Sequence, residues 1–248
     1  MTESSETKPI SPKPLPLEPR IVSVADSEAE ASCGLAHKTR ISTNLQAPLI
    51  LLVHGRAGNF DVMWTFRRAF SESWNAIAPQ APVLESPMSA SSPGLGAHSW
   101  WEVKEASRGE PAAMQSAATL LQSFLTRAIT HYKLAPTKII ALGFSQGAAV
   151  LSIILQRPKQ PFDAVGLLAG FVIKNHTANS LNPSLLNVCP VQMCHGERDE
   201  VVPLDLARKG YEHLSSLGFT LAMATDPVGH KIGPAGVRAL KSFLATYN

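Results

Sequence analysis

The sequence predicts an α/β fold with a mostly parallel central sheet and helices on both of its faces. The first indication is a set of short continuous apolar runs, of which residues 48–54 and 138–142 are the clearest. Runs of this length without polar alternation are typical of strands buried on both faces. The second indication is the regular alternation of such runs with segments of helical apolar spacing, divided by proline or glycine. That alternation favours parallel strands connected by helices.

The first 20 residues differ in composition from the rest of the chain. The segment MTESSETKPISPKPLPLEPR is rich in proline and polar residues and has few large apolar side chains. Such a segment cannot bury enough apolar surface to offset the entropy lost on ordering. We therefore expect residues 1–20 to be a disordered proline-rich tail. We expect residues 21–248 to form a single domain, because no linker separates a second apolar block.

The first half of this domain is expected to contain four strands and one helix. Residues 21–25 and 34–42 have the character of short half-buried strands that form a hairpin at the sheet edge. Asn59 is a suitable N-cap for a helix that extends through Phe70. The strands are expected at 21–25, 34–42, 48–54 and 74–78, followed by a long loop at 79–110.

The second half alternates helix and strand to the C-terminus. Pro158 ends one helix, and Pro234 is well suited to the first turn of the last one. Helices are expected at about 112–132, 148–156, 204–217 and 234–247, and strands at 138–142, 162–170, 191–196 and 219–224.

Composition excludes several classes of function. Lys and Arg number 22 and Asp and Glu 19, a net charge of +3 that is too small to indicate a nucleic-acid partner. No apolar run approaches the roughly 20 residues of a membrane span, so no integral membrane contact is expected. The polar N-terminus lacks the apolar stretch of a secretory signal. Three cysteines do not form a disulfide framework, and a cytoplasmic location is expected.

The most specific local motif is Gly143-Phe144-Ser145-Gln146-Gly147, which matches G-x-S-x-G. An apolar strand precedes it and an apolar helix follows it, which is the context this motif requires. Glycines at both ends allow a tight turn that leaves the Ser145 hydroxyl exposed at the end of the strand. The motif therefore predicts that Ser145 is a nucleophile.

A serine nucleophile needs a base, and in this type of fold the base follows the serine and the acid in the chain. His230 lies in a loop between the last strand and the last helix, where a base can reach back over the sheet edge. It is the preferred candidate for the base. The other histidines after the serine are His176, His195 and His213.

The candidate for the acid is Asp199, which lies between a strand and the helix beginning at Leu204. Asp205 is better placed in the first turn of that helix, where a negative charge is favourable. Asp226 lies too close to His230 in sequence to be an easy partner. Glu197 and Glu200 are the remaining alternatives.

Acyl transfer also requires amides directed at the developing oxyanion. The first apolar strand ends in His54-Gly55-Arg56-Ala57-Gly58, a position that is suitable for one such donor. The backbone amides of Arg56 and Gln146 are therefore predicted to form the oxyanion hole.

These segments, together with Ala78-Pro79-Gln80-Ala81-Pro82 and Ser99-Trp100-Trp101-Glu102, occur in the order of a known family. The chain resembles the phospholipase/carboxylesterase family of α/β-hydrolases, which includes acyl-protein thioesterases, over about residues 45–248. The resemblance implies an α/β-hydrolase fold. It also implies a triad of Ser145, Asp199 and His230. The gaps between residues 145, 199 and 230 already hold the expected strands and helices, so no large cap domain is expected. Two positions depart from the thioesterase branch, which typically has leucine at Arg56 and Trp-Phe-Asp at residues 100–102.

Three aromatic residues are candidates for substrate binding. Trp100 and Trp101 lie in the long loop on the side of the sheet where the strands end, and Phe171 opens a loop of about 20 residues. Pocket-lining aromatics are common in ligand sites, and long loops often select substrates. No metal-ligand spacing or nucleotide-binding motif is present, so neither a metal nor a cofactor is expected.

The expected function is hydrolysis of carboxylic esters through an acyl-enzyme, with thioesters and lysophospholipids as further candidates. The partner is then a small-molecule or lipid-like ester. Two alternatives use the same residues: a non-catalytic ligand-binding protein on this fold, and an acyltransferase. Chain-length preference, physiological substrate and oligomeric state do not follow from the sequence.

Overall fold

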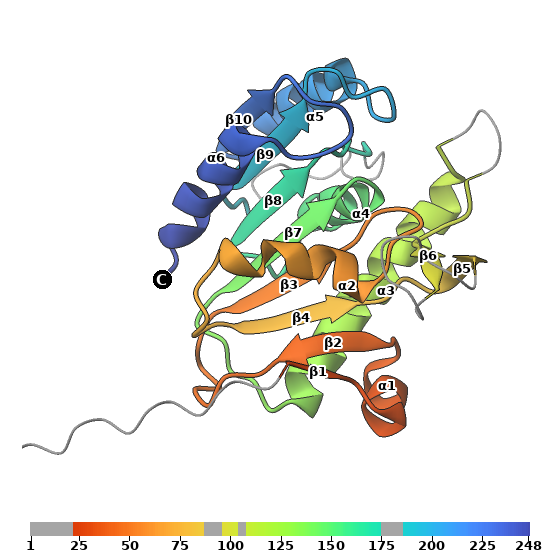
Figure 1. Cartoon of the computed structure of the whole chain (residues 1–248), viewed down its shortest axis with the longest axis vertical. Coiled ribbons are helices and arrows are strands. Elements are labelled where there is room, and N and C mark those ends of the chain that lie inside the picture. The colour runs from red at the N-terminus through yellow and green to blue at the C-terminus, as the bar shows by residue number, and fades with distance from the viewer. Residues whose placement is uncertain (1–21, 87–95, 104–107, 175–185) are drawn as a thin grey trace, which may run out of the picture.

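Eight strands form one twisted sheet through the centre of the structure (Figure 1). The computed structural model describes residues 22–86, 96–103, 108–174 and 186–248. The predicted disordered tail and His176 lie outside the described residues. The strands of the large sheet are β1 (Val22–Val24), β2 (His37–Arg40), β3 (Leu49–Val53), β4 (Asn75–Pro79), β7 (Ile139–Phe144), β8 (Ala164–Leu168), β9 (Val191–Gly196) and β10 (Leu221–Asp226).

The strands follow the order β1-β2-β4-β3-β7-β8-β9-β10. Every neighbouring pair from β4 to β10 is parallel, and only β1 and β2 run antiparallel to their neighbours. The helices are α1 (Ser27–Cys33), α2 (Phe60–Met63), α3 (Pro111–His131), α4 (Gln146–Leu155), α5 (Leu204–Ser216) and α6 (Pro234–Ala245), with a short 3₁₀ helix η1 (Trp64–Arg68). The predicted α/β-hydrolase fold with a mostly parallel sheet is confirmed.

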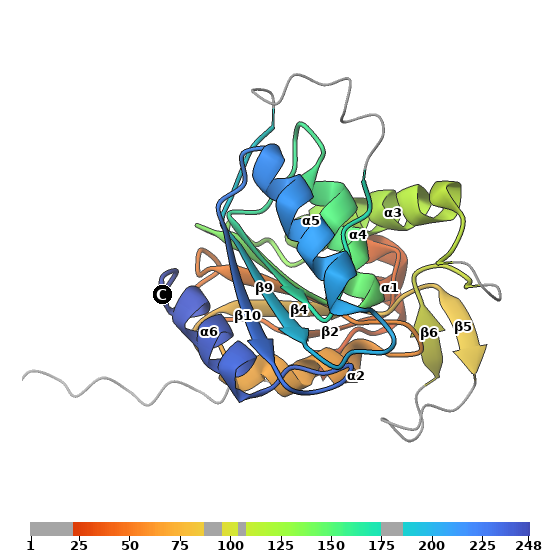
Figure 2. The same cartoon turned by 90° about the horizontal axis from the view of Figure 1, so that it is seen from above.

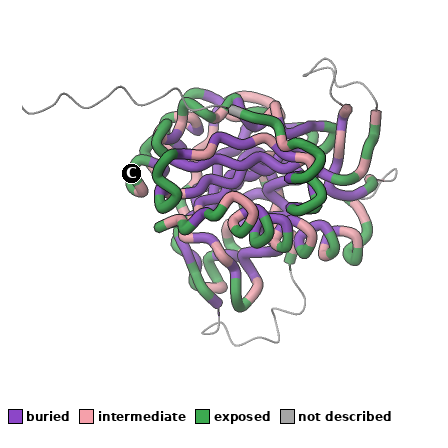
Figure 3. Tube along the Cα trace, turned by 90° about the horizontal axis from the view of Figure 1, so that it is seen from below, coloured by how far each residue is buried: buried purple, intermediate pink, exposed green. Residues whose placement is uncertain are grey.

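Helices cover both faces of the sheet, and the strand sequences explain why. Helices α3, α4 and α5 lie on one face and α2 and α6 on the other (Figure 2). In β3, Leu49, Leu51 and Val53 pack in the apolar layer on one face of the sheet. Ile50 and Leu52 pack in the apolar layer on the other face. Because successive side chains point to opposite faces, a strand between two layers must be apolar throughout. Buried strands accordingly occupy the middle of the molecule (Figure 3).

The sheet edge differs from the predicted hairpin. Strands β1 and β2 do pair antiparallel, but the segment of chain that connects them forms helix α1 instead of a tight turn. The Asp26 side chain accepts a hydrogen bond from the Ala29 amide at the start of α1, and Gly34 ends the helix with φ 89°. An N-cap aspartate and a left-handed glycine are standard helix boundaries, so this helix had a signal in the sequence.

The predicted loop at 79–110 contains a second, two-stranded sheet. Its strands are β5 (Val83–Ser86) and β6 (Ala97–Ser99), and an isolated bridge joins Gly58 to His98. The helix predicted after Asn59 is also shorter than expected, because α2 has four residues and continues as η1. Asn59 caps it as predicted, by accepting a hydrogen bond from the Asp61 amide.

Within the described residues, no helix is long and apolar enough to cross a membrane.

Candidate active site

Ser145 lies at the turn between β7 and α4, in a backbone conformation that residues other than glycine rarely adopt. Its φ is 52° and its ψ is −115°. A Cβ on Gly147 would come within 2.3 Å of the Val53 carbonyl oxygen, and one on Gly143 within 2.6 Å of the Gly147 oxygen. Only glycine therefore fits at these two positions, which explains the spacing of the motif. The close approach of α4 to β3 and β7 forces the turn that exposes the serine hydroxyl.

Three side chains that lie far apart in sequence meet at this turn. His230 Nε2 lies 3.0 Å from Ser145 Oγ, and His230 Nδ1 lies 2.8 Å from Asp199 Oδ2. Both distances are within hydrogen-bond range. The structure thus places the three residues proposed from the sequence in one continuous hydrogen-bonded chain.

The Asp199 carboxylate is held by its own loop. Its Oδ1 accepts hydrogen bonds from the Val201 amide at 3.0 Å and the Val202 amide at 2.8 Å. These bonds leave Oδ2 directed at the histidine, and the residue is 5% exposed. A buried carboxylate that accepts several hydrogen bonds is suited to orient a base and to stabilise its charged form.

The loop bearing His230 is attached to the loop bearing Asp199. The Arg198 amide donates to the Val228 carbonyl at 3.0 Å. A Cβ on Gly196 would lie 2.1 Å from the Gly229 oxygen, so the two backbones pack closely. The Phe144 ring lies 5.1 Å from the His230 ring, centroid to centroid. These contacts fix the imidazole between its two partners.

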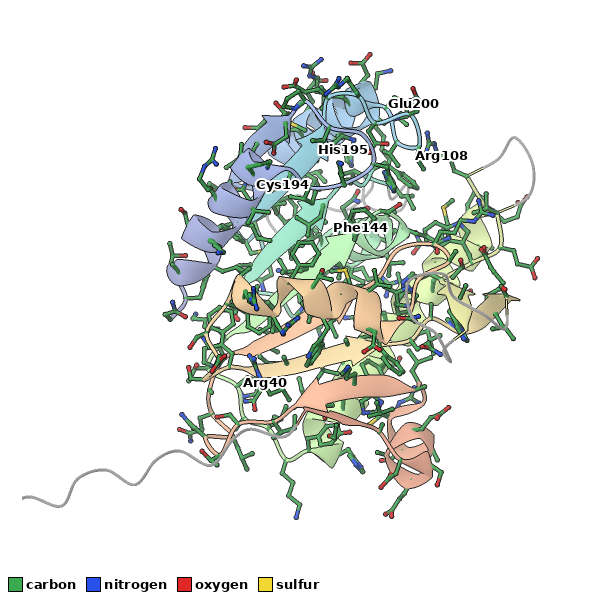
Figure 4. All side chains as sticks on the ribbon, in the orientation of Figure 1. Arg40, Arg108, Phe144, Cys194, His195 and Glu200 are labelled. Atoms are coloured by element: carbon green, nitrogen blue, oxygen red, sulfur yellow. The ribbon has the colours of Figure 1, made fainter. Side chains whose placement is uncertain are left out.

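The alternative acids have other partners. Asp226 accepts hydrogen bonds from the Ala235 and Gly236 amides at the start of α6. Glu197 accepts one from Thr225, and Asp205 pairs with Arg208 on the surface of α5. Glu200 is exposed on the side of the molecule where Arg108 also lies (Figure 4).

Of the alternative bases, His195 is the nearest to the site. Its Nε2 lies 2.7 Å from the Val202 carbonyl and 3.4 Å from Asp199 Oδ2, and it is buried below the acid loop. Its contacts are with the acid loop, so it helps to position Asp199. His213 lies on α5, where its Nε2 is 2.9 Å from Gln156 Oε1.

The loop after β3 packs directly against the serine. A Cβ on Gly55 would lie 3.1 Å from the Ser145 Cβ. The adjacent His54 is fully buried, and burial lowers its pKa to about 4. Its Nε2 accepts a hydrogen bond from the Ala81 amide at 3.0 Å, so the proton is on Nδ1, which donates to the Gly55 carbonyl. A neutral histidine therefore fixes the segment that bears Arg56.

The β5–β6 hairpin holds the same loop from the other side. The Ala57 amide donates to Ser99 Oγ at 3.0 Å, and Ser99 Oγ donates to Glu85 Oε1 at 2.5 Å. The Glu85 carboxylate also accepts a hydrogen bond from Arg56 Nε at 3.1 Å. No local sequence pattern connects residues 57, 85 and 99, so this arrangement was not predicted from the sequence.

The Gln146 side chain joins the serine turn to the tryptophan segment. Its Oε1 accepts from the Trp100 amide at 2.8 Å, and its Nε2 donates to the Trp101 carbonyl at 3.1 Å. Trp100 Nε1 in turn donates to the His54 carbonyl at 2.8 Å. Gln146 thus has a structural task in addition to the amide proposed for the oxyanion hole.

A cavity of about 360 Å³ opens beside Ser145. Its lining consists of Arg56, Trp101, Val103, Arg108, Ser145, Gln146, Phe171, Val201 and Val202. Of the three aromatic residues predicted to bind substrate, Trp101 and Phe171 line this cavity. Trp100 lies elsewhere: it packs on His54 and lines a neighbouring cavity of about 580 Å³ against α3. Arg108, Val103, Val201 and Val202 were not predicted from the sequence to line the site.

The cysteines are not suited to nucleophilic chemistry. All three are free and buried, and burial raises the pKa of Cys189 and of Cys194 to about 12. A thiol is reactive as the thiolate, so these groups are inert at neutral pH. Among the described residues, no three His, Cys, Asp or Glu side chains are grouped as metal ligands are.

Comparison with known proteins gives a consistent result. A family model described as phospholipase/carboxylesterase matches residues 39–248. An acyl-protein thioesterase 1 homologue from Dictyostelium discoideum is 26% identical over 196 residues, which are 76% of this chain and 84% of that protein. Acyl-protein thioesterase 1 from Gibberella zeae is 27% identical over 188 residues, or 72% and 79% of the two chains.

Solved structures share the fold. The carboxylesterase of Bacillus cereus has a TM-score of 0.74 at 16% identity, and the match covers 89% of this chain and 98% of that one. A protein of unknown function from Agrobacterium tumefaciens has a TM-score of 0.70 at 24% identity, with 88% and 99% covered.

Proposed function

Because this chain belongs to the phospholipase/carboxylesterase family, we propose that it hydrolyses carboxylic esters with Ser145, His230 and Asp199 as its catalytic triad. The observation that supports this most directly is the unbroken chain of contacts from Asp199 through His230 to Ser145, at 2.8 and 3.0 Å. A serine hydroxyl is a weak nucleophile alone and becomes effective when an oriented base accepts its proton.

The first half of the reaction forms an acyl-enzyme. His230 Nε2 takes the proton from Ser145 as the oxygen attacks the acyl carbonyl, and Asp199 stabilises the imidazolium through Nδ1. The backbone amides of Arg56 and Gln146 are the proposed donors to the oxyanion. Gln146 is the first residue of α4, where amides lack helical partners and the helix dipole favours negative charge. The proton then passes to the leaving alkoxide or thiolate.

The second half releases the acid. Water attacks the acyl carbon, His230 accepts its proton, and Ser145 leaves with a proton returned by the same imidazole. No cofactor is required by these steps. Thioesters fit the same chemistry, and the names of the curated relatives, acyl-protein thioesterases, make thioesters a second substrate class to test.

The triad is tested by replacing the nucleophile. Ser145→Ala is expected to lower kcat for a chromogenic short-chain ester by several orders of magnitude, on the order of 10⁶-fold. Ser152→Ala, which removes a buried serine hydroxyl away from the site, is the matched control and is expected to retain activity. Turnover in Ser145→Ala comparable to the parent would refute the triad.

Covalent labelling separates the alternatives. A fluorophosphonate is expected to modify Ser145 in the folded protein, and a peptide digest locates the adduct. A folded protein that binds esters without forming this adduct would be a binding protein instead. Product analysis with an added alcohol distinguishes hydrolysis, which yields the free acid, from acyl transfer, which yields a new ester.

A further inference from the structure

The cavity beside Ser145 has an unusual charge composition. Its lining includes two arginines, Arg56 and Arg108, and no acidic residue from the described part of the chain. The rest of the wall is mainly apolar or aromatic. Most small-molecule sites have such apolar walls with a few placed polar groups that fix orientation. Two guanidinium groups in one cavity beside the proposed nucleophile therefore favour a negatively charged substrate.

In the described part of the chain, Arg108 is held by aromatic residues and by no carboxylate. Its guanidinium carbon lies 5.0 Å from the centroid of the Phe171 ring, and its carbonyl accepts a hydrogen bond from Trp101 Nε1 at 2.7 Å. Both aromatic residues line the same cavity. No acidic side chain of the described residues is within ion-pair distance of Arg108. Stacking on an aromatic ring orients an arginine but does not neutralise its charge.

Arg56 is already compensated in part. Its Nε donates to Glu85 Oε1 at 3.1 Å, and that carboxylate also accepts the Ser99 hydroxyl. Glu200 is a further exposed acid, adjacent in sequence to Val201 of the cavity wall. Among the described residues that line the cavity, Arg56 is paired with Glu85, so the positive charge without a nearby acid is that of Arg108. A single positive charge is balanced by a carboxylate, which carries one negative charge, and not by a phosphate that carries two.

We propose that the preferred substrates are small esters that bear a carboxylate remote from the reacting carbonyl, bound by Arg108 with Arg56 beside it. The planar guanidinium donates in a fork that matches a carboxylate. A cavity of about 360 Å³ is at the small end of ligand sites, so a compact substrate fits it. This inference rests on the proposed ester hydrolysis and adds a substrate class to it.

Two matched substrate pairs test the preference. Monoethyl adipate, compared with the ethyl ester of adipic acid monoamide, places the charge on the acyl side. The compound para-(butanoyloxy)benzoate, compared with para-(butanoyloxy)benzamide, places it on the leaving-group side. Within each pair, the shape is nearly constant and only the charge changes. The ratio of kcat/KM for the charged member to that for the neutral member is the readout.

In the parent protein, this ratio is expected to be about ten or more in at least one pair, the size of one charge-assisted hydrogen bond. Arg108→Met is expected to reduce the ratio about tenfold, mainly through KM. Arg238→Met on α6 makes the same change of charge outside the cavity and is expected to leave the ratio unchanged. Because Arg56 and Arg108 are both exposed, added salt is also expected to lower the ratio in the parent protein.

The inference is overturned if the parent shows no preference in either pair, or if Arg108→Met preserves the ratio. Its failure is distinguishable from failure of the proposed function. A protein that hydrolyses the neutral members and labels with fluorophosphonate remains an ester hydrolase without charge selectivity. A protein that does neither would refute the proposed function itself.

Discussion

The backbone of Ser145 is under strain that the surrounding structure maintains. A non-glycine residue with φ 52° and ψ −115° occupies a sparsely populated region, at a cost of about 1–3 kcal/mol. The Ser145 amide donates to the Leu168 carbonyl at 2.8 Å, and the flanking glycines permit close packing of α4. The strain serves the proposed chemistry, because it presents the hydroxyl at the end of β7.

This strain makes a prediction about stability. Ser145→Gly removes the side chain that disfavours positive φ, whereas Ser145→Ala retains a Cβ. The glycine variant is therefore expected to have a free energy of unfolding about 1 kcal/mol higher than the alanine variant. Urea unfolding of the two variants, both inactive, measures the difference. Equal or reversed stabilities would show that the turn is not strained in solution.

At the scale of elements, the β5–β6 hairpin supports the loop that follows β3. The Ser99 hydroxyl accepts the Ala57 amide, and Ala57 itself has φ 53°. The hydrogen bond thus helps to hold a strained residue next to Arg56, whose amide is proposed to bind the oxyanion. An oxyanion donor is effective only when it is fixed in advance, so we expect the hairpin to influence the proposed catalysis through this loop.

Ser99→Ala is accordingly expected to lower kcat about tenfold with a smaller change in KM, because the oxyanion loop loses a fixed partner. The matched control is Ser152→Ala. Ser152 is equally buried, and its hydroxyl accepts the Ile173 amide at 3.0 Å and donates to the Ala149 carbonyl at 2.7 Å, so each variant loses one accepted and one donated hydrogen bond. Steady-state kinetics and urea unfolding of both variants provide the test. A similar loss of kcat in both would assign the effect to general destabilisation.

For the whole molecule, buried and partly buried histidines contribute to the dependence of stability on pH. Burial lowers the pKa values of His37, His54 and His213 from 6.5, that of His54 to about 4. The unfolded chain therefore takes up protons at a higher pH than the folded protein does. Below pH 6.5 the unfolded state binds more protons, so protonation favours unfolding.

The contribution of these neutral histidines to the free energy of unfolding is thus expected to be complete above pH 6.5. It is expected to decrease as the pH falls towards 4. Urea unfolding as a function of pH measures this decrease, and His54→Gln is expected to make it shallower. An NMR titration of the His54 ring in the parent gives its midpoint directly, even if the variant does not fold. A midpoint near 6.5 would contradict the buried, neutral histidine.

Much of the fold and of the candidate site followed from local patterns. Continuous apolar runs predicted the central strands, because a strand between two helical layers must be apolar on both sides. The motif around Ser145, with a strand before it and a helix after it, predicted the turn. The predicted chain order of nucleophile, acid and base pointed to Asp199 and His230. The structure places His230 against Ser145 and Asp199 against His230.

Other features depended on contacts between distant segments. The 79–110 region has little apolar periodicity, so β5 and β6 were missed; their pairing depends on the partner strand and on the bridge to Gly58. Trp100 and Trp101 are neighbours with the same chemistry, yet only Trp101 lines the cavity at Ser145. The Trp100 ring packs on His54 and donates to the His54 carbonyl, whereas the Trp101 ring donates to the Arg108 carbonyl. Contacts with residues distant in sequence thus decide the direction of each ring.

The sequence by itself determined the α/β architecture and the strand–serine–helix turn, because both arise from periodicity and local steric limits. Only the tertiary structure decided which charged groups share the cavity with Ser145. Arg108 comes from the segment before α3 and Arg56 from the loop after β3, and they meet because the carboxyl ends of parallel strands gather loops from the whole chain at one edge. Charge at such a site is a property of that gathering, which no local pattern records.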